Sequence, residues 1–221
     1  MARTVSDDDS EVDATGPAPA VADPAPLGLA GFALTTVLLS AFNAGLIKTH
    51  PLTFVGMALF YGGLGQFMAG MWEFRNRNTF GATAFSSYGA FWMGLGILFV
   101  FDTLGKLAPA GTFFGGDGAI WFLFLWAVFT TYMFVASLRV SGAVAVVFIL
   151  LALTFWALWL GAKNADLPGK GMTQIGGYLG IIPAAAAFYT SFAGVINSTF
   201  GRVVLPVMPL NRPLVRASGR R

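Results

Sequence analysis

The sequence predicts an all-α membrane protein with six transmembrane helices. Of its 221 residues, 56% are hydrophobic and only 10% are charged, whereas a soluble domain carries about 25% charged residues. The charges gather in short segments, and each uncharged run between them is near or above the ~18–20 residues that cross a bilayer as a helix. Lipid solvates a chain of this composition better than water does, so we expect a multi-pass membrane protein.

The first expected helix begins where a polar tail meets an uncharged apolar run. Asp23 can accept hydrogen bonds from the first backbone N–H groups, as an N-cap does, and Pro24 suits the first helical position. Such a helix start also attracts small anions, although ordinary capping explains the same residues. The six helices are expected at 26–47, 51–73, 83–104, 118–138, 141–162 and 173–198.

Polar or glycine-rich segments separate these helices. A polar turn at 48–51 ends in a proline that starts the second helix, and a charged turn at 73–78 precedes the third. The segment 105–118 is rich in glycine, Arg139 marks a tight turn, and 163–171 holds two lysines, an aspartate and a proline. Each break therefore has a chemical reason.

The chain divides into an acidic tail at 1–22, a transmembrane domain at 23–206 and a basic tail at 207–221. The acidic tail is expected to be disordered. Six spans put both termini on one side, and a cytoplasmic N-terminus places nine of the 13 basic residues inside and four outside. This agrees with the positive-inside rule. We therefore expect both termini in the cytoplasm and the protein in the inner (cytoplasmic) membrane.

Missing residue types exclude several kinds of chemistry. The chain has no cysteine and one histidine, which leaves no disulfide, no cysteine metal site and no paired-histidine metal or haem site. No lysine or arginine lies near the middle of an expected span, which argues against retinal held as a Schiff base. Motifs of intramembrane hydrolases are missing as well. We expect no enzyme activity, no cofactor, no metal and no nucleic-acid partner.

Uncharged polar residues are spread over the expected spans, among them Thr35, Asn43 and Gln66. Such groups either bond one helix to another or donate to a solute that must shed water. A pore of hydroxyls, amides and aromatic rings suits a small solute held weakly. Transport therefore fits the composition better than tight storage does.

Small and aromatic residues carry further expectations. A stripe on the second helix suits close helix packing or pore lining, and it consists of Gly56, Gly63 and Gly70. The run 184–187 is expected to pack the last helix in the same way. The six tryptophans and 22 phenylalanines are expected to face mostly lipid or the membrane interface.

Three motifs occur in order along the chain. The first is Asp23-Pro24-Ala25-Pro26-Leu27-Gly28-Leu29, followed by Gly31-Phe32 and Thr35-Thr36. The second runs from Tyr61-Gly62-Gly63 through Gln66 and Glu73 to Ser87-Tyr88-Gly89 and Phe91-Trp92. The third is Phe200-Gly201-Arg202 with Val204-Leu205-Pro206. Over 23–206 the chain resembles the acetate uptake transporters, also called succinate–acetate permeases.

The resemblance implies a homohexamer in the lipid bilayer, in which each six-helix subunit has its own pore for acetate and related short carboxylates, including succinate. The family's pore constriction of phenylalanine, tyrosine and leucine falls on Phe32, Tyr88 and Leu151, with Leu150 as the other choice for the leucine. Ala187 matches a small pore-facing position. The expected entrance and substrate-contacting residues are Pro24, Ala25, Pro26, Leu27, Gly28, Leu29, Thr35, Asn43 and Gln66.

The chain departs from the family at the first letter of the opening motif, where the family's asparagine is Asp23. Both residues cap helices, but an ionised carboxylate repels an approaching anion. We therefore assign the substrate role to the motif from Pro24 onward.

The leading hypothesis is channel-like or proton-coupled movement of acetate. Glu73, Asp102 and His50 are the titratable groups near span ends that could take a coupling proton, and each can equally be a plain interfacial residue, with Glu73 paired to Arg75 or Arg77. A second hypothesis is a neutral-solute channel for water, glycerol or ammonia. A third is a non-transporting membrane sensor or scaffold whose tails bind a partner.

Overall fold

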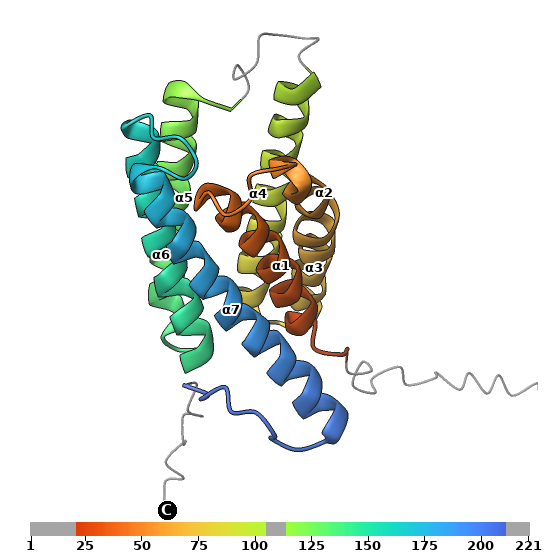
Figure 1. Cartoon of the computed structure of the whole chain (residues 1–221). Coiled ribbons are helices and arrows are strands. Elements are labelled where there is room, and N and C mark those ends of the chain that lie inside the picture. The colour runs from red at the N-terminus through yellow and green to blue at the C-terminus, as the bar shows by residue number, and fades with distance from the viewer. Residues whose placement is uncertain (1–20, 105–113, 211–221) are drawn as a thin grey trace, which may run out of the picture.

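Six helical spans run through the protein in alternating directions (Figure 1). The structure is a computed structural model that describes residues 21–104 and 114–210. Within these residues, six helical spans are long and apolar enough to cross a membrane. They are α1 (Ala25–Asn43), a composite span of α2 (Phe54–Leu59), η2 (Phe60–Gly65) and α3 (Gln66–Arg75), α4 (Thr79–Leu104), α5 (Gly116–Ser137), α6 (Gly142–Lys163) and α7 (Gly171–Phe200).

The prediction of an all-α protein with six spans is confirmed. The largest shifts are at the end of α1, which stops at Asn43 rather than at 47, and at the start of α4, which begins at Thr79 rather than at 83. The chain leaves α1 at Gly45, whose φ of +77° suits glycine and breaks the helix. A single turn, η1 (Pro51–Thr53), then precedes α2.

The start of α1 differs from the expectation by one residue. Pro24 is the N-cap and makes no side-chain cap bond, so the expected roles of Asp23 as N-cap and Pro24 as first helical residue are wrong. The Asp23 carboxylate nevertheless accepts a hydrogen bond from the backbone N–H of Ala25 at 2.9 Å. Asp23 thus still satisfies one of the free N–H groups of the helix start.

The two ends of the bundle differ in which parts of the chain they hold (Figure 1). At one end, which we call the terminal end, α1 begins and residues 201–210 lie. At the opposite end, which we call the far end, lie the turns 44–50 and 164–170. Asn197 fixes the chain beyond α7, because its side chain accepts from the N–H groups of Val204 and Leu205 and donates to the carbonyl of Leu205. The chain then bonds to the start of α6 through Gly142 N–H and the Met208 carbonyl at 2.8 Å.

Small residues bring α1 and α7 into close contact. On α7 they recur every three or four residues, which places them on one face: Gly177, Gly180, Ala184, Ala187, Ser191 and Gly194. Ser191 donates to the carbonyl of Pro26 at 2.7 Å. The expectation that 184–187 pack the last helix is confirmed for Ala184 and Ala187, which are fully buried. Without a hydrophobic force between helices in lipid, close contact of this kind holds a bundle together.

The predicted glycine stripe of the second span serves packing at two of its three positions. A Cβ added at Gly63 would lie 2.6 Å from Met93 Cγ, and one added at Gly70 would lie 2.5 Å from the backbone nitrogen of Ser86, both on α4. Gly56 faces open space, with nothing within 4 Å of such a Cβ. None of the three lines the cavity described below.

Replacing Gly177 by alanine is expected to lower the free energy of unfolding by about 1–3 kcal/mol, because the new Cβ overpacks a closed contact. It would lie 2.7 Å from both the Asn43 carbonyl carbon and the Ser40 carbonyl oxygen, and neither backbone can move freely. Gly56→Ala is the matched control and should leave stability unchanged or raise it slightly. Thermal unfolding of both variants in detergent measures the difference, and equal melting temperatures would contradict the assignment.

Candidate functional site: a mostly apolar cavity inside the bundle

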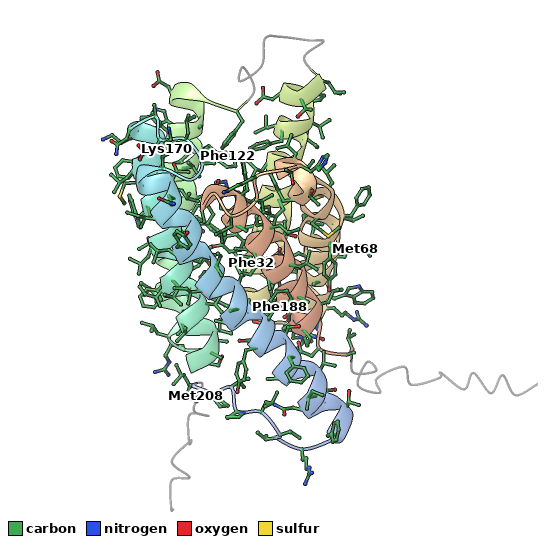
Figure 2. All side chains as sticks on the ribbon, in the orientation of Figure 1. Phe32, Met68, Phe122, Lys170, Phe188 and Met208 are labelled. Carbon is green, nitrogen blue, oxygen red and sulfur yellow. The ribbon has the colours of Figure 1, made fainter. Side chains whose placement is uncertain are left out.

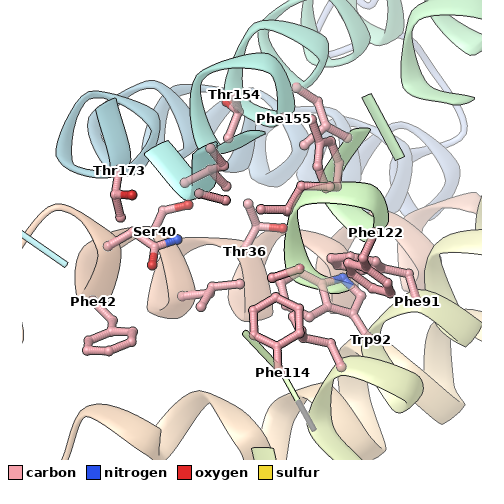
Figure 3. A pocket seen from close by; sticks show the side chains of 18 of the residues that line it. Thr36, Ser40, Phe42, Phe91, Trp92, Phe114, Phe122, Thr154, Phe155 and Thr173 are labelled. Atoms are coloured by element: carbon pink, nitrogen blue, oxygen red, sulfur yellow. The ribbon is translucent and has the colours of Figure 1, made fainter. Parts of the chain in front are cut away.

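A cavity of about 300 Å³ lies inside the bundle, in the half nearer the far end. It is bounded by α1, α4, the first half of α5, α6 and the start of α7 (Figure 3). Its volume is at the lower end of the range of about 300–1,000 Å³ typical of small-molecule sites. Aromatic rings form most of its wall, and they are Phe32, Phe42, Tyr88, Phe91, Trp92, Phe99, Phe114, Phe122 and Phe155.

Three side chains line the end of the cavity that lies in the middle of the bundle. Phe32, Tyr88 and Leu151 are the lining residues nearest the terminal end on α1, α4 and α6, respectively, and each is buried. The rings of Phe32 and Tyr88 lie 6.2 Å apart between centroids, and Figure 2 places Phe32 inside the bundle while Met68 and Phe188 lie on its surface. Phe32 and Tyr88 are the residues that the motifs predict for the constriction, and Leu151 is the first of the two leucines expected there; that the three form a constriction stays a prediction.

Tyr88 is held in place from several sides. Its hydroxyl shares a hydrogen bond of 2.8 Å with Thr130 Oγ1, and the rings of Phe129 and Phe148 lie 5.4 and 6.1 Å from its ring between centroids. Thr130 Oγ1 also donates a hydrogen bond to the carbonyl of Trp126 at 2.7 Å, and this bond holds the Thr130 hydroxyl in place next to Tyr88. The narrow point is therefore built from packed and bonded side chains.

Two polar atoms in the cavity wall have no partner in the described part of the chain. They are Thr36 Oγ1 and Trp92 Nε1, on α1 and α4. Thr36 is 5% exposed and Trp92 is 3% exposed, and Figure 3 shows both side chains at the same cavity. Buried polar groups are almost always hydrogen-bonded, so two unpartnered atoms on residues of a cavity wall are expected to bond to water or to a solute there. Both can donate, and the indole N–H can only donate.

The rest of the polar lining lies toward the far end. It consists of Ser40, Asn43, Thr154, Asp166 and Thr173. Asp166 is engaged, because its carboxylate accepts from the backbone N–H of Met172 at 2.7 Å at the start of α7. The backbone carbonyl of Asn43 accepts a hydrogen bond from the N–H of Gly169 at 2.8 Å, which connects the end of α1 to the turn 164–170. Among the described residues, no lysine or arginine lines the cavity.

The other predicted site residues lie elsewhere. The opening motif, Pro24 to Leu29, sits at the terminal end of α1, beyond the constriction, and none of its residues lines the cavity. It packs instead: a Cβ on Gly28 would lie 2.7 Å from the ring of Phe85. Thr35 and Gln66 are buried outside the cavity, and Ala187 is buried on α7. Of the predicted contact residues, Asn43 alone reaches the cavity with the constriction trio.

Sequence reasoning missed Trp92 as a residue of the cavity wall. The expectation that the aromatic residues mostly face lipid is wrong for the large set that forms the cavity wall and the core. The available signal was spacing: Trp92 lies four residues after Tyr88, which places both side chains on the same face of one helix.

The fold and the cavity define a multi-pass membrane protein with a mostly apolar cavity inside a single chain. The sequence model of the GPR1/FUN34/yaaH family matches residues 11–212, and the chain belongs to this family. This confirms the resemblance carried by the three motifs.

Relatives of known description support the same class. The chain is 40% identical to the succinate-acetate/proton symporter SatP of Escherichia coli strain K12, over 85% of this chain and 95% of that protein. It is 41% identical to acetate permease A of Emericella nidulans, over 84% of this chain and 65% of that longer protein. Among solved structures, that of the bacterial acetate channel SatP matches with a TM-score of 0.75 and 38% identity, covering 85% of this chain and 99% of that one.

Proposed function

We propose that this protein carries acetate and related short carboxylates, succinate among them, across the cytoplasmic membrane. The observation that carries the proposal is the mostly apolar cavity that ends at Phe32, Tyr88 and Leu151 and whose wall holds two unpartnered donors. Relatives named for acetate and succinate transport share about 40% of its residues. Because these relatives are transporters and channels, the protein acts by moving its solute and not by chemical catalysis.

The cavity suits a carboxylate that must enter and leave. The hydroxyl of Thr36 and the indole N–H of Trp92 can each donate to a carboxylate oxygen, and the surrounding rings can contact the methyl or methylene carbons. A charge-assisted hydrogen bond is strong enough to replace part of the lost hydration. Without a fixed cation the solute is bound but not trapped, which conduction requires.

We place the far end outside the cell and the terminal end in the cytoplasm. The terminal end holds Arg75, Arg77, Arg139 and Arg202, whereas Lys48, Lys163 and Lys170 lie at the far end, a distribution that follows the positive-inside rule. The cavity then opens toward the outer side, and the opening motif, Pro24 to Leu29, forms the cytoplasmic mouth beyond the constriction.

The assembly we propose is a homohexamer with one path in each subunit. The cavity and the constriction are both built from residues of one chain, so no second subunit is needed to complete the path. Large apolar side chains on the outer faces, such as Trp121 and Phe192, serve contacts with lipid or with neighbouring subunits.

Purified protein in liposomes is expected to take up labelled acetate well above protein-free liposomes, and unlabelled succinate should compete. The physical reason is that lipid is a strong barrier to the carboxylate anion, whereas the cavity offers it donors. Uptake is measured by filtration after subtraction of the empty-liposome signal.

Two parallel measurements separate the other hypotheses. Osmotic shrinkage with glycerol and internal alkalinisation by ammonia test for a neutral-solute channel, and deletion of residues 1–22 and 207–221 tests for a scaffold. Absence of acetate uptake together with rapid glycerol or ammonia flux would replace the acetate assignment. Loss of acetate uptake on removal of the tails would count against a path contained in the six spans.

A further inference from the structure

A second set of unpartnered polar atoms lies outside the cavity. They are Thr35 Oγ1, Gln66 Oε1, Glu73 Oε1 and Ser86 Oγ, none of which has a hydrogen-bond partner in the described residues. Thr35, Gln66 and Glu73 are at most 2% exposed. None of the four lines the cavity. We call the place where they lie, between α1, η2, α3 and α4, the polar seam.

Glycine contacts fix the order of these residues along the seam. Gly62 of η2 faces the side chain of Thr35, Gly70 of α3 faces Ser86 of α4, and Gly81 of α4 faces Glu73. Gln66 and Glu73 are seven residues apart, so they lie on one face of α3 about 10 Å from each other along the axis. The seam therefore runs from Thr35, beside the cavity residue Thr36, down to Glu73 near the terminal end.

We expect ordered water at the unpartnered polar atoms of the seam. Each such atom costs free energy unless a water bonds to it, and buried waters typically satisfy groups of this kind. The π-helical turn η2 lies at the same place, opposite Thr35, and such turns occur frequently at functional sites. A file of water between hydroxyl, amide and carboxyl groups is a medium in which a proton can move.

Glu73 is the titratable group of this seam. Its Oε2 accepts from Asn78 Nδ2 at 3.0 Å and its Oε1 is unpartnered. The expected pairing with Arg75 or Arg77 is wrong, since Asn78 is the partner and both arginines are exposed. The charged group that acts on Glu73 from a neighbouring element is Asp23, ahead of α1, and the first turn of α4 carries no charged side chain.

The other two candidates for a coupling proton are placed differently. His50 is exposed in the turn before α2. Asp102 is engaged at the far end, where its carboxylate accepts from the N–H of Phe114 at 3.0 Å. An ionisable side chain buried within a span marks a functional site by default, and of the three only Glu73 is buried.

We propose that the polar seam carries the proton that accompanies the carboxylate, with Glu73 as the group that takes it up and releases it on the cytoplasmic side. This inference rests on the proposed function. An anion entering against a negative-inside potential costs about 2.3 kcal/mol per 100 mV, and one proton moving with it cancels that cost. Glu73 gains one proton from the seam and loses it to water, so one proton and one carboxylate enter together by separate routes.

The test compares Glu73→Gln with Asp117→Asn in liposomes. Asp117 is an exposed acid at the start of α5, outside the cavity and the seam, so Asp117→Asn controls for loss of a carboxylate. Labelled acetate uptake is measured under two drives after subtraction of empty liposomes: an inward proton gradient at zero potential, and exchange against internal unlabelled acetate with no gradient. A voltage-clamping ionophore fixes the potential in both cases.

Glu73→Gln should lose gradient-driven accumulation by about tenfold or more, as removal of a proton-transfer group does. Acetate exchange should stay within about twofold of wild type, because the cavity is intact, and Asp117→Asn should keep both modes. Equal gradient-driven accumulation in wild type and Glu73→Gln would overturn the inference while leaving acetate transport standing. Failure of wild type in both modes would overturn the proposed function instead.

A second variant keeps the test valid if Glu73→Gln does not fold. Gln66→Leu interrupts the seam without touching the carboxyl, and it is also expected to lose gradient-driven accumulation with exchange retained. Retained accumulation in a folded Gln66→Leu protein would overturn the seam as the proton route. Infrared difference spectra after a pH change give an independent reading, since a carboxyl C=O band should vanish in Glu73→Gln and persist in Asp117→Asn.

Discussion

Acetate uptake is expected to fall by about 100-fold or more when Thr36 is replaced by valine and Trp92 by phenylalanine in one protein. Each change removes one unpartnered donor of the cavity wall; valine keeps the shape of threonine, and phenylalanine keeps an aromatic ring in a smaller side chain. A hydrogen bond to a charged group contributes about 1.5–3 kcal/mol, and every 1.4 kcal/mol is about a factor of ten. Initial rates over a range of acetate concentrations in liposomes measure the loss.

The single variant Thr36→Val should not be less stable than wild type. In the empty protein Thr36 Oγ1 is buried without a partner, which costs free energy, and an apolar replacement of the same shape removes that cost. A fall in transport with an unchanged or raised melting temperature of Thr36→Val therefore separates a binding role from a structural one. Destabilisation with unchanged transport would show that this hydroxyl bonds inside the protein and not to the solute.

Thr131→Val and Trp121→Phe provide the matched controls for these two changes. Thr131 and Trp121 are exposed on α5 and do not line the cavity. The combined control variant should transport acetate at the wild-type rate. An equal loss in the control and in the cavity variant would argue against a specific role of Thr36 and Trp92.

Size selectivity is expected to change when Tyr88 is replaced by alanine. The ring of Tyr88 stands against Phe32 at the closed end of the cavity, and its removal leaves a gap of ring size. The ratio of the butyrate or benzoate rate to the acetate rate should then rise by at least about tenfold over wild type. The reason is that the ring of Tyr88 sterically excludes bulky solutes, and its removal widens the path. Rates for a series of carboxylates in liposomes measure this effect.

Tyr88→Phe isolates the hydroxyl from the ring. It loses the hydrogen bond to Thr130, but Thr130 keeps its bond to the Trp126 carbonyl, so size selectivity should remain as in wild type. Tyr88→Ala is expected to cost about 3–5 kcal/mol of stability, as large-to-small changes of aromatic core residues do. Tyr132→Ala, at an exposed ring of α5, is the control, and unchanged selectivity in a folded Tyr88→Ala protein would remove Tyr88 from the constriction.

Hydropathy and charge alone predicted the six spans, because a helix that crosses lipid must satisfy its own backbone and be apolar along its length. The ends of the spans differ from the predicted ends by up to four residues. At the end of α1 the cause is the positive φ of Gly45, which stops the helix. The constriction residues came from motif resemblance, and the structure brings Phe32, Tyr88 and Leu151 to one end of one cavity. The resemblance did not predict where the opening motif lies relative to the cavity. In the structure Pro24 to Leu29 lie at the terminal end of α1 and line no part of the cavity.

The sequence by itself determined the class of protein, the number of spans and the family. Only the tertiary structure decided which side of each helix faces inward, and with it Trp92 as a cavity donor and Glu73 as the acid of a separate seam. The physical reason is that lipid and the protein interior are similarly apolar, so a transmembrane helix shows little contrast between its two faces. The inward face becomes visible only when Gly70, Gly81 and Gly177 show which helices touch and where.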